Sequence, residues 1–300
     1  MKFSGQEKTI LSNRHSLLAL LARYFPEITS KDWEITPLTG LSGGSYHLRA
    51  IVKMQPINVI ARAQGKTQSS LMVNRRKEAR VLQQLQGFVQ APRQLARNRD
   101  WLLLSWCDGQ HPSPEQFLTP QFQSALAATI AKLHTQPLLS YRLQLRDEIA
   151  HYGYLIDRKR QQPRWLRLHH YFLSTPMPKM LKLAPAHMDI HRGNILCAND
   201  KSIMLLDWEY AANTDIGLSL ETYFQANQLD QKQRQFFLYQ YGARCGAYTD
   251  VATLARHCAR WEPWVKYMML MWYEVQWNQS QNPNFLIGSQ PLRQYFHLSN

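Results

Sequence analysis

Three polar residues in the second half of the chain have the types and spacing that phosphoryl transfer requires. Asp189 and Asn194 belong to a segment, residues 187–194, that reads H-x-D-x-x-x-x-N, and Asp207 ends a short apolar run eighteen residues after Asp189. Kinase-type chemistry uses one carboxylate to accept or orient the hydroxyl proton of the acceptor, and an amide oxygen plus a second carboxylate to hold magnesium on the phosphates of ATP. The pattern therefore predicts Asp189 as the base, and Asn194 and Asp207 as magnesium ligands.

The local elements must bring these three residues together. A tight loop carrying Asp189 and Asn194, a strand, a turn at Asn199-Asp200 and a second strand ending at Asp207 would place them at one edge of a hairpin. The simpler alternative is that they are ordinary polar loop residues. H-x-D alone is common by chance, but the complete pattern is much rarer.

A glycine-rich turn precedes this region. Residues 33–36 and 46–52 read as strands, and the segment between them is rich in glycine and serine. Such a turn can cover phosphates, because its backbone N–H groups approach them closely, although a plain hairpin turn is the alternative. The residues predicted to cover the phosphates are Ser42, Gly43, Gly44 and Ser45.

A basic residue lies in the third predicted strand. Residues 59–63 form this strand, with Arg62 in the position where a lysine in protein kinases contacts the phosphates. A helix is predicted over residues 70–86, and its Glu78 is the natural ion-pair partner of Arg62. The alternatives are a solvent-facing arginine and a surface glutamate paired within its own helix.

A hinge is predicted after the next hairpin. Residues 93–97 and 101–106 read as two strands, and the second runs into a polar segment rich in glycine and proline. The backbone of the last three residues before this change would face the adenine edge of a nucleotide. These residues are Ser105, Trp106 and Cys107.

The remaining segments read as helices. Apolar spacing predicts helices over residues 12–25, 121–134 and much of 142–173, and Asp215 reads as the N-cap of another. The tail repeats large apolar residues at helical spacing from Trp261 onward. Most such stripes belong to a core, and the less common alternative is that a few of these residues line an acceptor pocket.

The bulk properties exclude several classes. The 300 residues carry a formal net charge of +14, but the Lys and Arg are scattered and match no nucleic-acid-binding signature. The longest apolar runs are too short to span a bilayer, and no apolar signal segment opens the sequence. The four cysteines lack C-x-x-C spacing, which favours reduced thiols over disulfides or structural zinc. We therefore expect a soluble, cytoplasmic protein without a nucleic-acid or membrane partner.

The motifs carry a resemblance. Residues 40–45, 187–194 and 207–211 and the tryptophan-rich tail resemble the aminoglycoside phosphotransferase and choline kinase superfamily and, within it, bacterial thiamine kinases. The resemblance implies an α+β, bilobal, protein-kinase-like fold with a small antiparallel-sheet N-lobe and a mainly helical C-lobe. It implies the transfer of a phosphate from ATP, with magnesium, to the hydroxyl of thiamine by a chain that acts as a monomer. The expected divisions are a helical segment (1–30), an N-lobe (31–107) and a C-lobe (108–300).

Thiamine carries a fixed positive charge on an aromatic ring, so acidic and aromatic residues should contact it. The candidates are Glu209, Glu221, Trp272 and Glu274. Other kinases with alcohol acceptors remain open, with choline, an aminoglycoside or a lipopolysaccharide sugar as acceptor. A non-catalytic nucleotide-binding module is the alternative from another class, and Arg62 in place of lysine is the feature that favours it.

Overall fold

The computed structural model describes residues 5–38, 44–64, 73–198 and 202–298. The chain forms two compact units. Unit 1 comprises Met1–His111 and Gly193–Tyr210, and unit 2 comprises Pro112–Arg192 and Ala211–Asn300. Residues 193–210 belong to unit 1, although in the sequence they follow residues 112–192, the first segment of unit 2.

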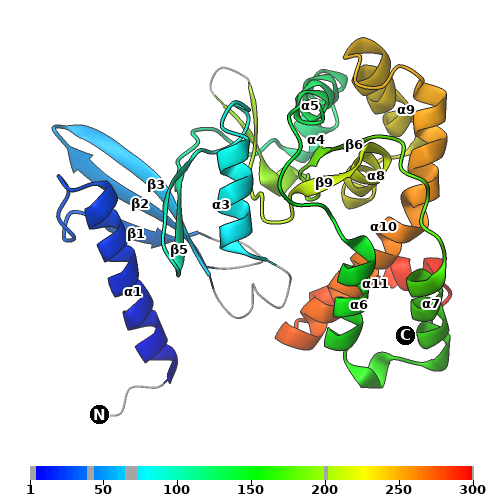
Figure 1. The fold of residues 1–300 in the computed structure, drawn as a ribbon, viewed down its shortest axis with the longest axis horizontal. Coiled ribbons are helices and arrows are strands. Elements are labelled where there is room, and N and C mark those ends of the chain that lie inside the picture. Colours follow the sequence, from blue (N-terminus) through cyan, green and yellow to red (C-terminus); the bar gives the residue numbers. More distant parts are fainter. Residues whose placement is uncertain (1–4, 39–43, 65–72, 199–201, 299–300) are drawn as a thin grey trace. The chain divides into compact units, whose positions relative to one another are not determined.

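Unit 1 is built on an antiparallel sheet of five strands (Figure 1). The strands are β1 (Glu34–Pro37), β2 (Ser45–Val52), β3 (Gln55–Ala63), β4 (Gln94–Arg97) and β5 (Trp101–Ser105), in the order β1-β2-β3-β5-β4. The predicted antiparallel N-terminal sheet is confirmed, and each predicted strand agrees with an observed one apart from shifts at its ends.

Helices pack on both faces of this sheet. The helix α1 (Gly5–Tyr24) buries Leu17 and Leu21 against Leu48 and Ala61, which face it from the sheet. Successive side chains in a strand point to opposite faces, so Arg62 points away from α1. The helix α3 (Arg75–Gln84) lies on the Arg62 side and begins at Asn74, whose side chain accepts hydrogen bonds from the N–H groups of residues 76 and 77.

A short hairpin completes unit 1. Its strands are β7 (Ile195–Cys197) and β8 (Ile203–Leu205), preceded by a single 3₁₀ turn, η2 (Arg192–Asn194). The N–H of Leu205 donates to the carbonyl of Gln90 at 2.8 Å, and Trp208 packs edge-to-face on Phe88. The hairpin is thus attached to the segment between α3 and β4. The predicted turn at Asn199-Asp200 lies outside the described residues.

Unit 2 is mainly helical, as expected. Its helices are α4 (Pro114–Phe117), α5 (Pro120–Leu133), α6 (Leu145–Leu155), η1 (Arg158–Arg160), α7 (Pro163–Ser174), α8 (Ile216–Ala226), α9 (Gln231–Tyr239), η3 (Gln240–Arg244), α10 (Val251–Ser280) and α11 (Pro283–Tyr295). Two short strands, β6 (Leu183–Ala186) and β9 (Ala212–Asp215), pair in an antiparallel manner.

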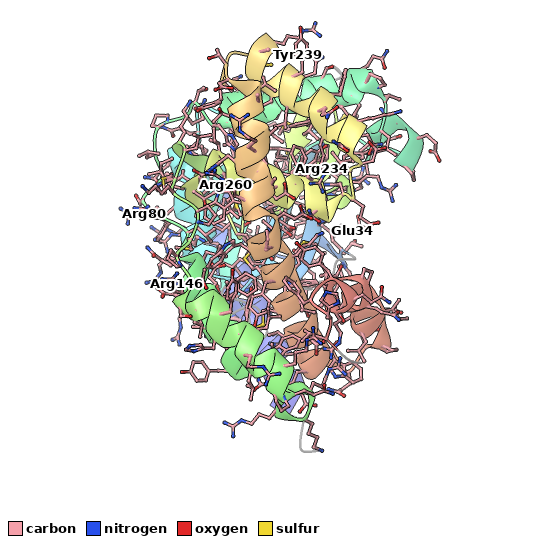
Figure 2. The ribbon with its side chains drawn as sticks, turned by 90° about the vertical axis from the view of Figure 1, so that its right-hand side faces the viewer. Glu34, Arg80, Arg146, Arg234, Tyr239 and Arg260 are labelled. Carbon is pink, nitrogen blue, oxygen red and sulfur yellow. The ribbon has the colours of Figure 1, made fainter. Side chains whose placement is uncertain are left out.

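The long helix α10 organises the packing of unit 2. It contacts α6, α8 and α11, and Figure 2 shows it as one continuous helix. Trp261, Trp264 and Val265 are buried, which confirms that the tryptophan-rich stripe is mainly core. Among the described residues, no helix has the length and apolar character needed to cross a membrane.

The predicted cap at Asp215 is confirmed. Its carboxylate accepts a hydrogen bond from the N–H of Gly217 at 2.8 Å, and the ring nitrogens of His257 and Trp261 on α10 contact the same oxygen at 2.8 and 3.1 Å. One carboxylate therefore caps α8 and also joins this helix to α10.

Candidate active site

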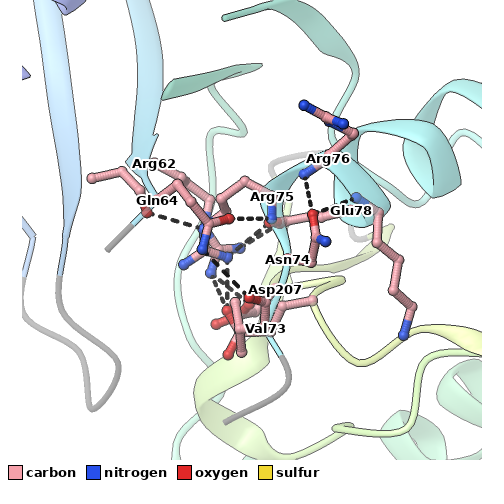
Figure 3. Close-up of polar contacts among 11 residues, drawn as sticks. Arg62, Gln64, Val73, Asn74, Arg75, Arg76, Glu78 and Asp207 are labelled. Atoms are coloured by element: carbon pink, nitrogen blue, oxygen red, sulfur yellow. Dashed lines mark hydrogen bonds and ion pairs between the residues drawn. The ribbon is translucent and has the colours of Figure 1, made fainter. Parts of the chain in front are cut away.

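Arg62 is the centre of a buried charge cluster in unit 1. Its Nη1 donates to Glu78 at 2.6 Å, and its Nη2 donates to Asp207 at 2.7 Å and to Glu209 at 2.8 Å (Figure 3). The side chains of Arg62, Glu78 and Glu209 are almost completely buried, whereas that of Asp207 is 25% exposed. The predicted pairing of Arg62 with Glu78 is therefore present, but it is one contact of a larger cluster.

Arg75 is the second cation of this cluster, and the sequence reasoning missed it. Its Nη1 donates to Glu78 at 2.8 Å and to Glu209 at 2.7 Å, and its Nε donates to the carbonyl of Ala63 at 3.3 Å. Two guanidinium groups thus face three carboxylates, which leaves one surplus negative charge when all are ionised. A cation at the exposed side of Asp207 would compensate that charge.

The cluster shifts the pKa values of its members in opposite directions. Burial raises the pKa of Glu209, and the neighbouring charge of Asp207 adds to this effect despite Arg62 and Arg75. Burial acts in the same direction on Asp207, but the charge and the hydrogen bond of Arg62 outweigh it, so the pKa of Asp207 is lowered. Asp207 is therefore the carboxylate of this pair that keeps its negative charge.

The hairpin brings Asn194 and Asp207 to the same end. Ile195 pairs with Leu205, and the N–H of Leu206 donates to the carbonyl of Asn194 at 2.8 Å. Asp207 has a left-handed backbone, with φ of 64°, a conformation that non-glycine residues adopt mainly where the surrounding structure enforces it. The predicted arrangement at one hairpin edge therefore holds for these two residues.

The donor chemistry of this edge fits magnesium. Among the described residues, no three His, Cys, Asp or Glu side chains form a complete metal-binding set. Magnesium is commonly held by only one or two protein oxygens, with phosphates and water supplying the remaining ligands. The carboxylate of Asp207, which keeps its negative charge, and the amide of Asn194 agree with that mode.

Asp189 lies in a constrained loop of unit 2. The preceding residue, Met188, has a left-handed φ of 66°, which is unusual for a bulky side chain. The N–H of Asp189 donates to Nδ1 of the fully buried His187 at 3.3 Å, and Asn227 donates to the carbonyl of Ile190 at 2.8 Å. The loop is thus held to α8, the helix that Asp215 caps.

Only the end of the predicted phosphate-covering turn can be described. Ser42 and Gly43 lie outside the described residues. Gly44 has φ of 71°, a conformation for which glycine is suited, and its carbonyl accepts from the N–H of Ala63 at 2.7 Å. Ser45 pairs with Arg62 across β2 and β3.

The predicted hinge residues follow directly from β5. Ser105 ends this strand and exchanges backbone and side-chain hydrogen bonds with Arg93. The Trp106 ring stacks on His47 of β2 with a centroid distance of 4.0 Å and an interplanar angle of 27°. Burial raises the pKa of the Cys107 thiol. His47 was not predicted, and only the alternation of β2 could have placed it on the same face as Ser45.

The predicted acceptor residues belong to two different units. Glu209 belongs to the Arg62 cluster of unit 1. In unit 2, Glu221 is paired with Arg234 at 3.1 Å, and Glu274 accepts hydrogen bonds from Arg160 and Arg293 at 2.6–3.0 Å. The half-buried Trp272 packs edge-to-face on Tyr273 and Phe285. Each of the three carboxylates thus already has an arginine partner.

Comparisons with known proteins identify the family of this chain. Residues 59–254 match the model of the phosphotransferase enzyme family. The thiamine kinase of Salmonella paratyphi A is 31% identical over 267 residues, which cover 89% of this chain and 90% of that protein. The thiamine kinase of Escherichia coli O1:K1 is 30% identical over 271 residues, with the same coverage.

Solved structures share the fold at much lower identity. The ethanolamine kinase of Plasmodium vivax is 15% identical with a TM-score of 0.75, covering 93% of this chain and 86% of that one. The choline kinase LicA of Streptococcus pneumoniae is 15% identical with a TM-score of 0.71, covering 98% and 99%. The predicted kinase-like fold is thereby confirmed, and the chain belongs to the phosphotransferase enzyme family.

Proposed function

We propose that the protein is a thiamine kinase, which transfers the γ-phosphate of ATP to the primary hydroxyl of thiamine and releases ADP and thiamine phosphate. The observation that carries this proposal is the similarity to thiamine kinases along nine tenths of both chains. The end of the β7–β8 hairpin supports it, because an amide and a carboxylate lie together there beside the buried Arg62 cluster.

The catalytic roles follow the chemistry of the side chains. Asp189 accepts the proton of the thiamine hydroxyl as the oxygen attacks phosphorus. Asn194 and Asp207 would hold magnesium, which supplies charge neutralisation to the phosphates when it is bound. The turn from Ser42 to Ser45 would cover the phosphates with its backbone N–H groups.

Arg62 has a positioning role in this proposal. Both of its terminal nitrogens donate to carboxylates, and one of them holds Asp207. Its planar fork of donors can bind three carboxylates at once, which the single ammonium of a lysine cannot do with the same geometry. Glu78 and Arg75 fix the orientation of this fork from α3.

The nucleotide base and the acceptor need surfaces of their own. We propose that the backbone of Ser105, Trp106 and Cys107 contacts the adenine. We propose that Trp272 contacts the thiazolium ring of thiamine. Its indole packs on Tyr273 and Phe285, and no cation among the described residues lies over its face. The protein would act as a monomer in the cytoplasm, where ATP is abundant.

ADP release from magnesium-ATP tests the proposal directly. Thiamine, choline, kanamycin and no acceptor are compared on the purified chain and on Asp189→Asn, and product masses are read from the same tubes. We expect thiamine-dependent ADP release with a mass gain of one phosphate, absent from the variant. Turnover of choline or kanamycin alone would overturn the acceptor but keep the reaction. ATP binding without turnover of any acceptor would favour a non-catalytic module.

A further inference from the structure

An arginine-rich pocket lies at one end of the sheet in unit 1. It has a volume of about 440 Å³, and four arginines line it together with polar side chains and one indole. The arginines are Arg75, Arg76, Arg97 and Arg99, and the indole is that of Trp101. Neither Asp nor Glu lines this pocket among the described residues, so the concentration of positive charge is not compensated from within it.

The pocket is separate from the residues assigned to catalysis. Trp101 pairs with Ala63 in the sheet, so its indole faces the α1 side, and it lies in the core cluster with Leu17 and Leu21. Arg62 and Ser45 point to the other face. The pocket lies where β3 ends, where β4 turns into β5 and where α3 begins, and it does not include Asn194 or Asp207.

The walls of the pocket are held in place by hydrogen bonds. The N–H of Gln64 donates to the carbonyl of Asp100 at 2.8 Å, and its Oε1 accepts from the N–H of Arg75 at 2.7 Å. The Asn98 side chain accepts from the N–H groups of residues 100 and 101 and donates to Ser16 of α1. Three elements are thus joined around the pocket, and the β4–β5 turn is anchored to α1.

The arginines of this pocket have unused donors. Arg76, Arg97 and Arg99 form no side-chain ion pair with any described residue, and their side chains are exposed. Arg75 is 3% exposed, and its Nη2 has no hydrogen-bond partner within the described part of the chain. An unpaired buried guanidinium nitrogen is costly, and an oxyanion is the ligand whose geometry suits several guanidinium groups at once.

We propose that this pocket binds a phosphate-type oxyanion of several charges, such as diphosphate or a phosphate monoester. Its volume suits a small phosphorylated molecule. Arg97 and Arg99 on the β4–β5 turn and Arg76 on α3 supply exposed donors, and Arg75 supplies a buried one.

Arg75 connects the pocket to the catalytic cluster. The guanidinium that lines the pocket also donates to Glu78 and Glu209 through Nη1. A bound oxyanion competes with these carboxylates for the charge of Arg75, which changes the balance around Arg62 and Asp207. We therefore expect an oxyanion bound in this pocket to change the rate of phosphoryl transfer. This effect rests on the proposed function, whereas the binding of the oxyanion does not.

Binding is measured by titrating the full chain with sodium diphosphate by calorimetry at constant ionic strength, without magnesium and with a saturating non-hydrolysable ATP analogue. The test variant is Arg97→Gln/Arg99→Gln. The matched control is Arg80→Gln/Arg93→Gln, which removes the same charge from exposed positions of α3 and the β4 approach that do not line the pocket.

We expect the dissociation constant to rise at least tenfold in the test variant and to change less than twofold in the control. Equal affinity in the two double variants, no binding at all, or binding that the ATP analogue abolishes would each overturn the site. Repeating the titration with thiamine phosphate and with inorganic phosphate identifies whether an organic monoester or the inorganic anion binds more tightly.

The regulatory effect has its own measurement. Steady-state turnover is followed with and without diphosphate at constant free magnesium. We expect diphosphate to change kcat/KM of the wild type and of the control at least threefold. The test variant should have the same kcat/KM as the wild type without diphosphate, and diphosphate should not change it. An equal response in all three proteins would overturn the coupling through Arg75. Loss of thiamine turnover altogether would instead contradict the proposed function and leave the binding result intact.

Discussion

Ser45 lies directly opposite Arg62 across β2 and β3, so their side chains share one face of the sheet. The register therefore connects the end of the glycine-rich turn to the residue at the centre of the charge cluster. Any shift of one strand by a single residue would turn Arg62 toward α1 and away from Glu78. The sheet thus sets the position of Arg62 within its charge cluster.

Replacing Arg62 by methionine should destabilise the protein strongly. The substitution leaves Glu78 and Glu209 with Arg75 as their arginine partner and removes the arginine that Asp207 contacts. Breaking a buried ion pair on one side typically costs about 3–5 kcal/mol. Arg62→Lys keeps one charge and should lose about half as much stability. Calorimetric unfolding of the three proteins checks this order. Equal stability of wild type and Arg62→Met would contradict the cluster.

Asp207→Asn should abolish turnover and leave the fold intact. Arg62 keeps Glu78 and Glu209 as partners, and the amide oxygen of Asn can still accept its hydrogen bond, so we expect an unfolding free energy within about 1 kcal/mol of the wild type. Turnover should fall at least about 10³-fold if Asp207 holds magnesium as proposed, because the metal would lose a ligand. The exposed Asp32→Asn is the control. A variant with near-normal kcat would refute the metal role of Asp207.

Trp106→Leu should weaken nucleotide binding selectively. The indole stacks on His47 beside the strand that carries Arg62, and its removal deprives the proposed base site of an aromatic wall. We expect KM for ATP to rise about 3- to 10-fold and KM for thiamine to stay within twofold. Equal increases in both KM values would indicate a general structural role instead.

Glu274→Gln distinguishes a packing role from an acceptor contact. The carboxylate is fully buried between Arg160 and Arg293, so its neutralisation should cost about 3 kcal/mol or more of stability. If it is only a packing residue, KM for thiamine should remain within twofold at a temperature where the variant is folded. A tenfold higher KM for thiamine would restore Glu274 as an acceptor contact, with the exposed Glu27→Gln as the control.

His134 should make the protein less stable in mild acid. Burial, together with the charge of Lys182, lowers the pKa of His134 to about 3, and its ring nitrogens contact Tyr241 at 2.8 Å and Ser219 at 3.1 Å. The unfolded chain takes up this proton near pH 6.5, so stability is lost as pH falls below about 6.5. Between pH 7 and pH 5 this one group should cost about 2 kcal/mol.

Urea unfolding at the two pH values measures this effect. In His134→Asn the loss between pH 7 and pH 5 should be smaller by about 2 kcal/mol, because the titrating group is gone. In the exposed His170→Asn it should equal that of the wild type. The same pH dependence in His134→Asn and the wild type would contradict the assignment.

Local patterns predicted most of the elements of this fold. Alternation located the strands of unit 1, helical spacing located α1 and α5, and the cap at Asp215 located the start of α8. The strands β6 and β9 were missed because each has four residues, and β6 reads Leu-Ala-Pro-Ala, where proline argues against a strand. Their pairing with each other joins residues thirty positions apart, which no local pattern reveals.

The site was only partly predictable for a similar reason. The spacing of Asn194 and Asp207 correctly predicted that both residues lie at the same end of a hairpin. Arg75 was not assigned to the site, although its i,i+3 spacing to Glu78 was a usable signal. Its contact with Glu209 spans 134 positions, so only the folded chain shows that Glu209 contacts two arginines.

The discontinuity of unit 1 has a consequence for the order in which the chain folds during synthesis. Residues 1–111 leave the ribosome first, but the β7–β8 hairpin and Asp207 and Glu209 follow only after about eighty residues of unit 2. Until then Arg62 and Arg75 have Glu78 as their one partner in the cluster, and the nascent sheet carries a buried surplus of positive charge. Unit 1 therefore cannot complete its fold while only residues 1–111 have been synthesised. Its fold is completed after the ribosome has translated the first segment of unit 2 and then the β7–β8 hairpin with Asp207 and Glu209.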